Sequence, residues 1–357
     1  MKKFIIFLTI LLLLAGCSDE KPAATQPPET TQAPTQAPTE TAAPKTRADI
    51  QLVILLPDEE TLYWGEVGPQ LQEMLGNYFY DAQLYYANSN PREQAKQITE
   101  AVEAGVDGII LAPVESAALL DACQLAQEAG IPIFSYDRLL MDTEAVTYYV
   151  SLDYYAMGAE IGEQIISQAT LADLEEGSQL TIEFLMGSPE DPTALFLYNG
   201  VMDQLRPYLE KEILVAKSGR IALEDTCVVD WDPITAGDNF RSYLKEYYNG
   251  KAPDIICTVD DNFAGACIAV LEEKRTPVPP VITGVGGGED SSLNIADGVQ
   301  SLTLRIDRTE LNQRLAATVD AVISGQTPEL NDTDNCFNNV TTVPAYLCGY
   351  EVITPET

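Results

Sequence analysis

Two charged residues follow an apolar, strand-like run at residues 131–135, with only Tyr136 between. They are Asp137 and Arg138, and neither is of a type that belongs inside a strand of that composition. A carboxylate accepts two hydroxyl hydrogens, and a guanidinium offers a rigid fork of donors. Side by side, they satisfy adjacent hydroxyl groups of a small ligand. Asp191, Trp64 and Trp231 add a further carboxylate and two aromatic faces, which pack against the C–H surface of a ring.

Each of these residues also has a purely structural interpretation. Asp137 and Arg138 would form a surface ion pair worth about 0–1 kcal/mol if nothing bound between them. Trp64 and Trp231 would then belong to the hydrophobic core. The position just past a strand favours the ligand role, because doubly wound sheets bind ligands outside the carboxyl ends of their strands.

Several kinds of chemistry are excluded by composition. The chain has no histidine, which removes Ser-His-Asp and Cys-His nucleophilic sites and imidazole metal sites. Residues 284–288 form a glycine-rich run after a strand, but Glu289 stands where a dinucleotide fingerprint needs its third glycine. Residues 331–334 lack the glycine and terminal glutamate of a calcium loop. We therefore expect no cofactor, no metal and no catalytic residue.

Charge and cysteine content narrow the partners further. With 20 basic and 55 acidic residues the net charge is −35, so a nucleic-acid backbone is not an expected partner. Six cysteines besides Cys17 show no Cys-x-x-Cys spacing, which argues against a zinc or redox motif. An extracytoplasmic location permits a disulfide. Cys336 with Cys348 is the pair we would expect to form one.

The N-terminus indicates export and lipid attachment. Lys2 and Lys3 precede an apolar run at residues 4–14, and Leu14-Ala15-Gly16-Cys17 resembles a bacterial lipobox. Cys17 is then the lipidated residue; the alternative is an ordinary secretory signal with a chance cysteine. Residues 18–47 are rich in Pro and Thr, repeat Thr-Gln-Ala-Pro twice, and have too little apolar surface to fold. We interpret them as a disordered tether.

The rest of the chain alternates between strand-like and helical patterns. Short β-branched runs alternate with segments of helical spacing, first over residues 51–135 and again over residues 180–306. Apolar strands of this kind belong to parallel sheets that are covered on both faces. We therefore predict an α/β protein with two doubly wound parallel sheets. The predicted strands are 51–56, 83–86, 108–112, 131–135, 180–186, 213–216, 255–259, 281–284 and 302–306.

The order of short motifs carries a family resemblance. Residues 134–140 (FSYDRLL) are followed by 146–153 (VTYYVSLD), and 186–191 (MGSPED), 230–233 (DWDP) and 343–347 (VPAYL) come later. This series resembles the periplasmic sugar-binding proteins of ABC transporters, in the branch that includes xylose-binding and multiple-sugar-binding members. The resemblance runs from about residue 50 to about residue 354, and the Tyr-Asp-Arg block is its most specific part.

The resemblance implies a type I periplasmic binding protein fold, in which two lobes close around a ligand on a three-strand hinge. The N-terminal lobe would comprise residues 48–152 and 307–337, and the C-terminal lobe 153–306 and 338–357. The chain would cross between the lobes near Leu152, Ile306 and Phe337. Closure stabilised by ligand contacts from both sides is a known switching mode.

Departures from the xylose-type pattern add four residues to the implied ligand site. Tyr63 and Thr193 stand where those proteins have arginine and asparagine, Asp260 replaces asparagine, and Arg305 stands beside Ile306, where a lysine is expected. Together with Trp64, Asp137, Arg138, Asp191 and Trp231 they complete the predicted ligand set. The changes make the site more acidic, so we expect a neutral or cationic ligand and not a sugar acid.

The resemblance implies a function outside the cytoplasmic membrane. We expect a monomeric, lipid-anchored solute-binding protein at the cell membrane that captures a monosaccharide and delivers it to the membrane subunits of an ABC importer. A sensory protein that presents the closed form to a receptor would have the same sequence features. An extracytoplasmic glycosidase is a weaker alternative, because it needs two carboxylates about 5–9.5 Å apart and the motif order supplies no such pair.

Overall fold

The computed structural model describes residues 45–175, 177–275 and 281–356. The predicted signal peptide, its Cys17 and residues 18–44 of the predicted tether lie outside these ranges. Among the helices within them, none combines the length and the apolar composition that a membrane span requires.

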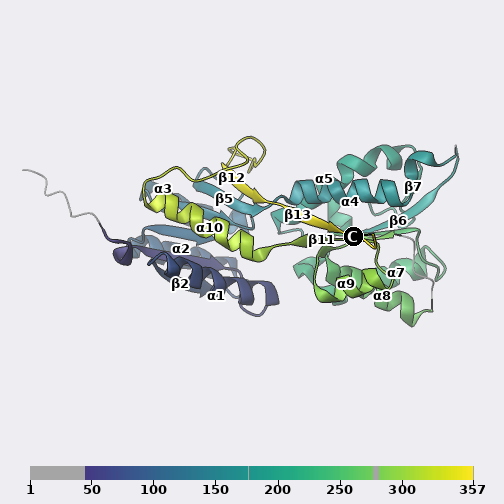
Figure 1. Cartoon of the computed structure of the whole chain (residues 1–357), viewed down its shortest axis with the longest axis horizontal. Helices are drawn as coiled ribbons and strands as arrows, with labels where there is room; N and C mark the ends of the chain where they lie inside the picture. Colours follow the sequence, from purple (N-terminus) through teal and green to yellow (C-terminus); the bar gives the residue numbers. More distant parts are fainter. Residues whose placement is uncertain (1–44, 176, 276–280, 357) are drawn as a thin grey trace, which may run out of the picture. The chain divides into compact units, whose positions relative to one another are not determined.

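The first sheet contains six parallel strands in the order β12-β5-β4-β3-β1-β2 (Figure 1). These are β1 (Gln51–Leu56), β2 (Asp81–Tyr86), β3 (Gly108–Leu111), β4 (Ile133–Tyr136), β5 (Val146–Leu152) and β12 (Ala345–Cys348). Alternate side chains of β1 enter two separate cores, since Leu52 and Ile54 join one and Val53 and Leu55 the other. Helices α1 (Leu62–Asn77) and α10 (Arg308–Ile323) cover the first face, and α2 (Pro91–Ala104) and α3 (Leu120–Glu128) the second.

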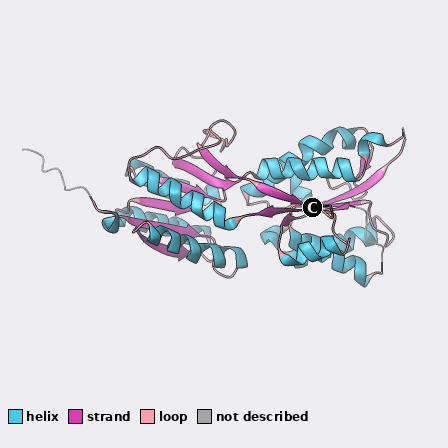
Figure 2. Cartoon of the chain, viewed as in Figure 1, coloured by secondary structure: helices cyan, strands magenta, loops and turns pink. Residues whose placement is uncertain are grey.

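The second sheet contains four parallel strands in the order β7-β6-β8-β9. They are β6 (Leu180–Leu185), β7 (Leu214–Val215), β8 (Ile255–Thr258) and β9 (Val281–Ile282). Helices α4 (Tyr154–Gln168) and α5 (Pro192–Glu210) pack on one face, and α7 (Pro233–Glu246) and α8 (Asp261–Glu273) on the other. Helices therefore cover both faces of each parallel sheet, as Figure 2 shows, and the predicted α/β class is confirmed.

A third sheet of three strands has the order β10-β11-β13. Strands β10 (Val285–Gly286) and β11 (Thr303–Ile306) are parallel, while β13 (Tyr350–Ile353) runs antiparallel to β11. Within the described ranges, the remaining helices are α6 (Leu223–Thr226), α9 (Glu289–Ala296) and four short 3-10 turns, at Arg47–Asp49, Ser116–Ala118, Leu171–Asp173 and Val229–Trp231.

The strand pairing corrects one predicted boundary. The sequence predicts that residues 338–357 belong as a whole to the C-terminal lobe, but β12 pairs in parallel with β5 and belongs to the first sheet. The chain reaches the third sheet only at β13, so the third crossing lies between Cys348 and Tyr350 and not near Phe337. The physical reason is that β12 completes the backbone hydrogen bonding of β5, a long-range pairing that local sequence does not reveal. The other predicted lobe limits stay predictions.

The predicted tether is also too long at its C-terminal end. Lys45 pairs with Asp107 at 2.6 Å, and Arg47 pairs with Asp320 at 2.8 Å. The guanidinium of Arg47 also lies over the ring of Tyr80, 5.6 Å from its centroid. Residues 45–47 are therefore held against the folded part of the chain.

The six described cysteines are all free, so the expected Cys336–Cys348 disulfide is wrong. The two residues belong to different cores, on opposite faces of the first sheet. Burial raises the pKa of both thiols to about 12, as expected for small apolar side chains.

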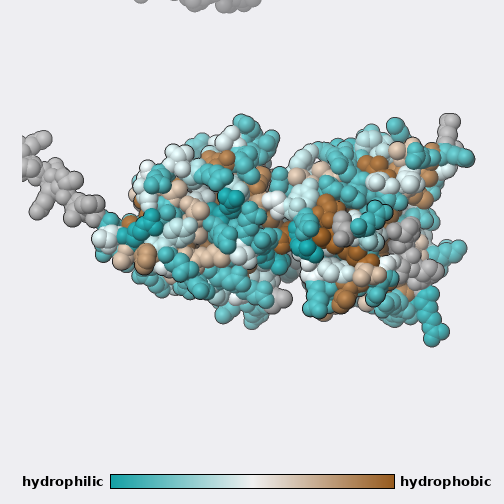
Figure 3. All heavy atoms as spheres, viewed as in Figure 1, coloured by the Kyte–Doolittle hydropathy of each residue, from teal (hydrophilic) through white to brown (hydrophobic). Residues whose placement is uncertain are grey.

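The surface visible in Figure 3 is mostly hydrophilic, with hydrophobic patches scattered over it.

Candidate functional site

Asp137 stands at the carboxyl end of β4 in a left-handed conformation, with φ of 61°. Its backbone N–H donates to the Val150 carbonyl at 2.9 Å. Its own carbonyl accepts hydrogen bonds from the Tyr149 and Ser151 hydroxyls, both at 2.8 Å. A left-handed non-glycine residue costs free energy and persists only where its surroundings fix it. Neighbouring β5 therefore holds Asp137 in place, a role that sequence reasoning did not assign.

The Asp137 carboxylate is only 4% exposed, and its Oδ1 accepts a hydrogen bond from the Tyr154 hydroxyl at 2.6 Å. Burial raises the pKa of this carboxyl group. The Tyr154 hydrogen bond and the Arg138 charge oppose that rise, and the charge of Asp191 adds to it. Tyr154 is the first residue of α4, so a helix of the second sheet contributes directly to the surroundings of Asp137.

Arg138 does not pair with Asp137. Its Nε lies 2.8 Å from Asp191 Oδ2, but the N–H direction does not meet hydrogen-bond geometry, so this contact is ionic. The guanidinium also lies 5.3 Å from the ring centroid of Trp64, within cation–π range. The interpretation as a surface ion pair between Asp137 and Arg138 is therefore wrong. Arg138 instead joins the carboxyl edge of the first sheet to that of the second.

Trp64 and Tyr63 lie near the start of α1, which follows β1. Their ring centroids are 4.5 Å apart, and the Trp64 ring is 6.3 Å from the ring of Tyr136. Trp64 is 3% exposed and belongs to the hydrophobic core, while its face remains in contact with Arg138. The guanidinium of Arg308 lies 4.8 Å from the Tyr63 centroid.

Asp191, Thr193 and Trp231 form one hydrogen-bonded group at the second sheet. Asp191 caps α5, and its Oδ1 accepts from the Thr193 backbone N–H at 2.9 Å and the Thr193 hydroxyl at 2.8 Å. Its Oδ2 accepts from the indole Nε1–H of Trp231 at 3.1 Å. The Trp231 ring stacks on Phe263 at 5.9 Å, and a Cβ at Gly187 would lie 2.1 Å from it, so only glycine fits there.

Asp260 follows β8 and caps α8, accepting from the backbone N–H groups of Asn262 at 2.7 Å and Phe263 at 3.2 Å. Burial raises the pKa of its carboxyl group to about 6, although these backbone hydrogen bonds oppose the rise. Asp260 follows β8 as Asp191 follows β6, so both lie at the same carboxyl edge of the second sheet, and the stacking of Phe263 on Trp231 connects their surroundings.

Within the described ranges, Arg305 is the one predicted ligand residue that no hydrogen bond, ion pair or ring contact links to the others. It is exposed on β11 and pairs with Glu351 of β13 at 3.0 Å.

Asp261 contacts the glycine-rich run at residues 284–288. Its Oδ2 accepts from the Gly287 N–H at 2.8 Å, and a Cβ at Gly284 would lie 2.1 Å from its Oδ1. Gly284 and Gly286 therefore accommodate Asp261.

Two helices fix the spacing of Tyr154 and Asp191. Helices α4 and α5 begin at these residues and cross with their backbones in near contact. A Cβ at Gly158 would lie 2.1 Å from the Leu197 carbonyl oxygen, and one at Gly200 would lie 2.2 Å from that of Tyr155. The partners of Asp137 and Arg138 are thus set by one tight helix crossing.

Contacts therefore run from Trp64 through Arg138 and Asp191 to Trp231, and we call these four residues the inter-sheet chain. It contains two aromatic rings, a guanidinium and a carboxylate, the kinds of group that bind a hydroxyl-rich ring. Within the described ranges, no group of three or more His, Cys, Asp or Glu residues is arranged to hold a metal ion.

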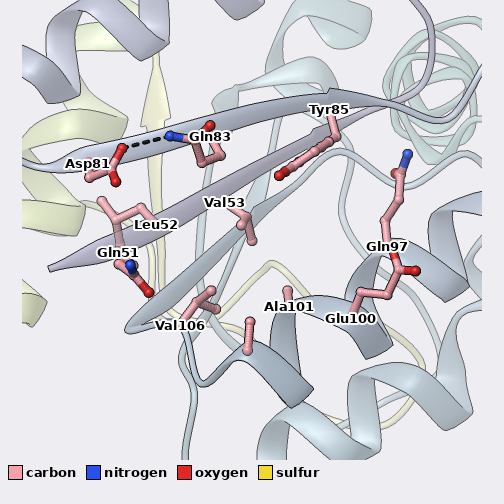
Figure 4. Close-up of a pocket in the computed structure, with 11 residues that line it drawn as sticks. Gln51, Leu52, Val53, Asp81, Gln83, Tyr85, Gln97, Glu100, Ala101 and Val106 are labelled. Carbon is pink, nitrogen blue, oxygen red and sulfur yellow. Dashed lines mark hydrogen bonds between the residues drawn. The ribbon is translucent and has the colours of Figure 1, made fainter.

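A separate pocket of about 350 Å³ lies between β1, β2 and α2 (Figure 4). Its lining includes Asp81 and Gln83, which are hydrogen-bonded to each other at 2.7 Å, and the exposed ring of Tyr85. None of the predicted ligand residues lines it. This pocket and the inter-sheet chain are therefore different places on the molecule.

Comparisons with known proteins agree with the geometry. A model of the periplasmic binding protein domain matches residues 52–327, and a model of the prokaryotic membrane lipoprotein lipid attachment site matches residues 1–18. The multiple sugar-binding periplasmic protein SbpA of Azospirillum brasilense is 30% identical over 298 residues, covering 82% of this chain and 83% of that protein. The multiple sugar-binding periplasmic receptor ChvE of Rhizobium radiobacter is 29% identical over 310 residues, covering 85% and 87%.

A solved structure is similar over most of its length. An ABC transporter solute-binding protein from Clostridium phytofermentans, crystallised with bound β-D-glucose, superimposes with a TM-score of 0.80 at 28% identity. The match covers 86% of this chain and 94% of that one.

Proposed function

This chain belongs to the periplasmic binding protein family, and from that premise we propose that it captures a monosaccharide between its two lobes and delivers it to an ABC importer. The family resemblance noted in the sequence is thereby confirmed, as is the type I fold. The lipid attachment site makes the protein a lipid-anchored one at the extracytoplasmic face of the cell membrane.

The inter-sheet chain is the observation that carries the proposal. Arg138 follows β4 of the first sheet and Asp191 follows β6 of the second, and they meet at 2.8 Å. Ligands of doubly wound sheets bind at these carboxyl edges. A sugar ring inserted there would stack against Trp64 or Trp231 and receive hydrogen bonds from both lobes. Tyr63, Thr193, Asp137, Asp260 and Arg305 complete the proposed ligand set.

We assign the lobes by the sheet pairing. The N-terminal lobe comprises the first sheet with α1, α2, α3 and α10, and it includes β12. The C-terminal lobe comprises the second sheet with its helices, and the third sheet forms the hinge. The protein acts as a monomer in this proposal, because one chain supplies both sides of the site.

The proposal assigns no catalysis to the site. The curated relatives are named as sugar-binding proteins or receptors and not as enzymes. An assay for sugar release from glycosides tests this part directly, and turnover would overturn it. A sensory role, in which the closed form contacts a receptor, uses the same site and differs only in the partner.

The proposal is tested by a thermal-shift screen of the full chain carrying Cys17→Ser, which lacks the thiol for lipid attachment. The panel contains D-glucose, D-galactose, D-xylose, L-arabinose, D-ribose and myo-inositol. A sugar at about 100 times its Kd stabilises the protein by about 2.7 kcal/mol, so at least one sugar should raise the melting temperature by several degrees. If no sugar shifts the transition at millimolar concentration, the proposed function is wrong.

A further inference from the structure

We propose that this site selects its ligand by charge, taking neutral or amine-bearing sugars and rejecting those with a carboxylate or phosphate, and that Asp260 sets this preference. The inference rests on the proposed function. It goes further because it names the class of carbohydrate and the residue responsible.

Three helix N-termini near the site are already occupied, whereas the side chain of Thr61 caps no N–H group at the start of α1. The start of a helix attracts anions through its free N–H groups and its dipole. Here Asp191 caps α5, Asp260 caps α8, and Asp153 caps α4 by accepting from the Ala156 N–H at 3.0 Å. At α4, α5 and α8 the chain's own carboxylates thus take N–H groups that a sugar acid or sugar phosphate would otherwise use.

The cations of the proposed site offer no replacement, and one of them, Arg305, is already paired with Glu351 at 3.0 Å. Arg138 is 16% exposed, and its charge is matched by Asp191 at 2.8 Å. The guanidinium of Arg308 is exposed and lies over the ring of Tyr63. Solvent screens an exposed charge strongly, so Arg308 adds little attraction for an anion.

Two carboxylates, those of Asp137 and Asp260, have no ion-pair partner within the described ranges. Asp137 is 4% exposed and receives its hydrogen bond from the neutral hydroxyl of Tyr154, while its neighbour Arg138 pairs elsewhere. The Asp260 carboxylate accepts hydrogen bonds from the N–H groups of Asn262 and Phe263 in α8, and no ion pair reaches it within the described ranges. A second negative charge brought into this cleft by a ligand would meet uncompensated like charge, whereas an ammonium group would be attracted.

Calorimetric titration near pH 7 with a ring-matched series tests the inference: D-glucose, its amine D-glucosamine and its acid D-glucuronate. We expect D-glucuronate to bind at least ~10-fold more weakly than D-glucose, and D-glucosamine to bind at least as tightly. Asp260→Asn keeps the helix cap, because Asn and Asp cap equally well. In this variant the ratio of the Kd for D-glucuronate to the Kd for D-glucose should fall by at least ~3-fold.

Asp332→Asn is the matched control. Asp332 accepts from the backbone N–H groups of Asp334 and Asn335 in a turn, and its own N–H bonds the Ala345 carbonyl at the amino end of β12, the edge opposite the site. The control loses the same charge, and it should leave the ratio of the Kd values for D-glucuronate and D-glucose unchanged.

The outcomes separate the two proposals. Glucuronate binding as tightly as glucose, or an unchanged ratio in Asp260→Asn, overturns the charge inference and leaves sugar binding intact. If none of the three sugars binds, and the wider panel also fails, then the proposed function falls and the charge inference falls with it.

Discussion

At Asp260, local structure and charge act in opposite directions. The carboxylate satisfies two backbone N–H groups at the start of α8, yet burial raises its pKa to about 6. For an acid, a folded pKa above the unfolded value means that ionisation destabilises the fold. Asp260 therefore costs stability at neutral pH, and the cost declines as pH falls through about 6.

Replacing Asp260 by Asn should stabilise the unliganded protein in a pH-dependent way. The difference between about 6 and the ordinary value of 3.8 corresponds to at most ~3 kcal/mol at about pH 8, and partial exposure reduces it. Near pH 5 the gain in the free energy of unfolding should be about half of its value at pH 8. Urea denaturation at the two pH values measures this.

The control substitution should behave in the opposite way. Burial acts to raise the pKa of Asp332, but hydrogen bonds from Asn335 and Asp334 outweigh it and lower the pKa. Asp332→Asn should therefore not stabilise the protein at pH 8. A gain there equal to that of Asp260→Asn would mean that relief of general negative charge, and not burial of Asp260, explains both.

The residues that sequence alone could predict are those just after strands. Asp137, Arg138, Asp191 and Asp260 each follow an apolar run, and the structure finds them at carboxyl edges of the two parallel sheets. Tyr154 was missed because the first residue of a helix carries no local signal of its contact with a distant carboxylate. Arg305 was included for its place beside Ile306, but its contact with Glu351 depends on β13, which is distant in sequence.

At the scale of elements, the crossing of α4 and α5 is the most demanding packing near the site. Gly200→Ala would place a Cβ 2.2 Å from the Tyr155 carbonyl oxygen, where backbone cannot yield cheaply. We expect a loss of ~1–3 kcal/mol or more in unfolding free energy and weaker sugar binding, because the helix starts at Tyr154 and Asp191 would separate. Guanidinium denaturation and calorimetry provide the two measurements.

Gly265→Ala is the matched control for that substitution. Gly265 lies inside α8, and a Cβ there would meet nothing within 4 Å. Alanine should therefore stabilise the protein by ~0.5–1 kcal/mol, through helix propensity. If Gly200→Ala stabilises the protein as Gly265→Ala does, then helix propensity alone governs both substitutions and the close crossing is not real.

The strands show which features of the fold the local hydrophobic pattern predicts. The predicted strand at 51–56 coincides with β1, while that predicted at 131–135 is β4 at Ile133–Tyr136, because pairing with β3 begins only at Ile133. Strand β12 was placed in the wrong lobe, since its pairing with β5 joins segments nearly two hundred residues apart. Hydrophobic pattern identifies a strand, but hydrogen-bond partners decide its sheet.

At the scale of the whole molecule, one chain supplies two parallel sheets whose carboxyl edges meet at Arg138 and Asp191. The alternation of apolar strands and helices predicted both sheets, and the motif order predicted the family. The exchange of partners, in which Arg138 binds Asp191 and Asp137 binds Tyr154, could not be predicted, because it depends on how the two sheets come together. A ligand bound at this junction must draw affinity from both sheets.

The most direct test is therefore calorimetric titration of the sugar found by the thermal screen into the wild type, Arg138→Ala and Asp191→Asn. Arg138→Ala removes a donor fork from the first sheet and should weaken binding by at least ~10-fold, about 1.4 kcal/mol. Asp191→Asn keeps the cap of α5 but removes the charge on the second sheet, and it should weaken binding as well. Intact affinity in either variant, with only a lower melting temperature, would show that the Arg138–Asp191 pair is a structural ion bridge and that the sugar binds elsewhere.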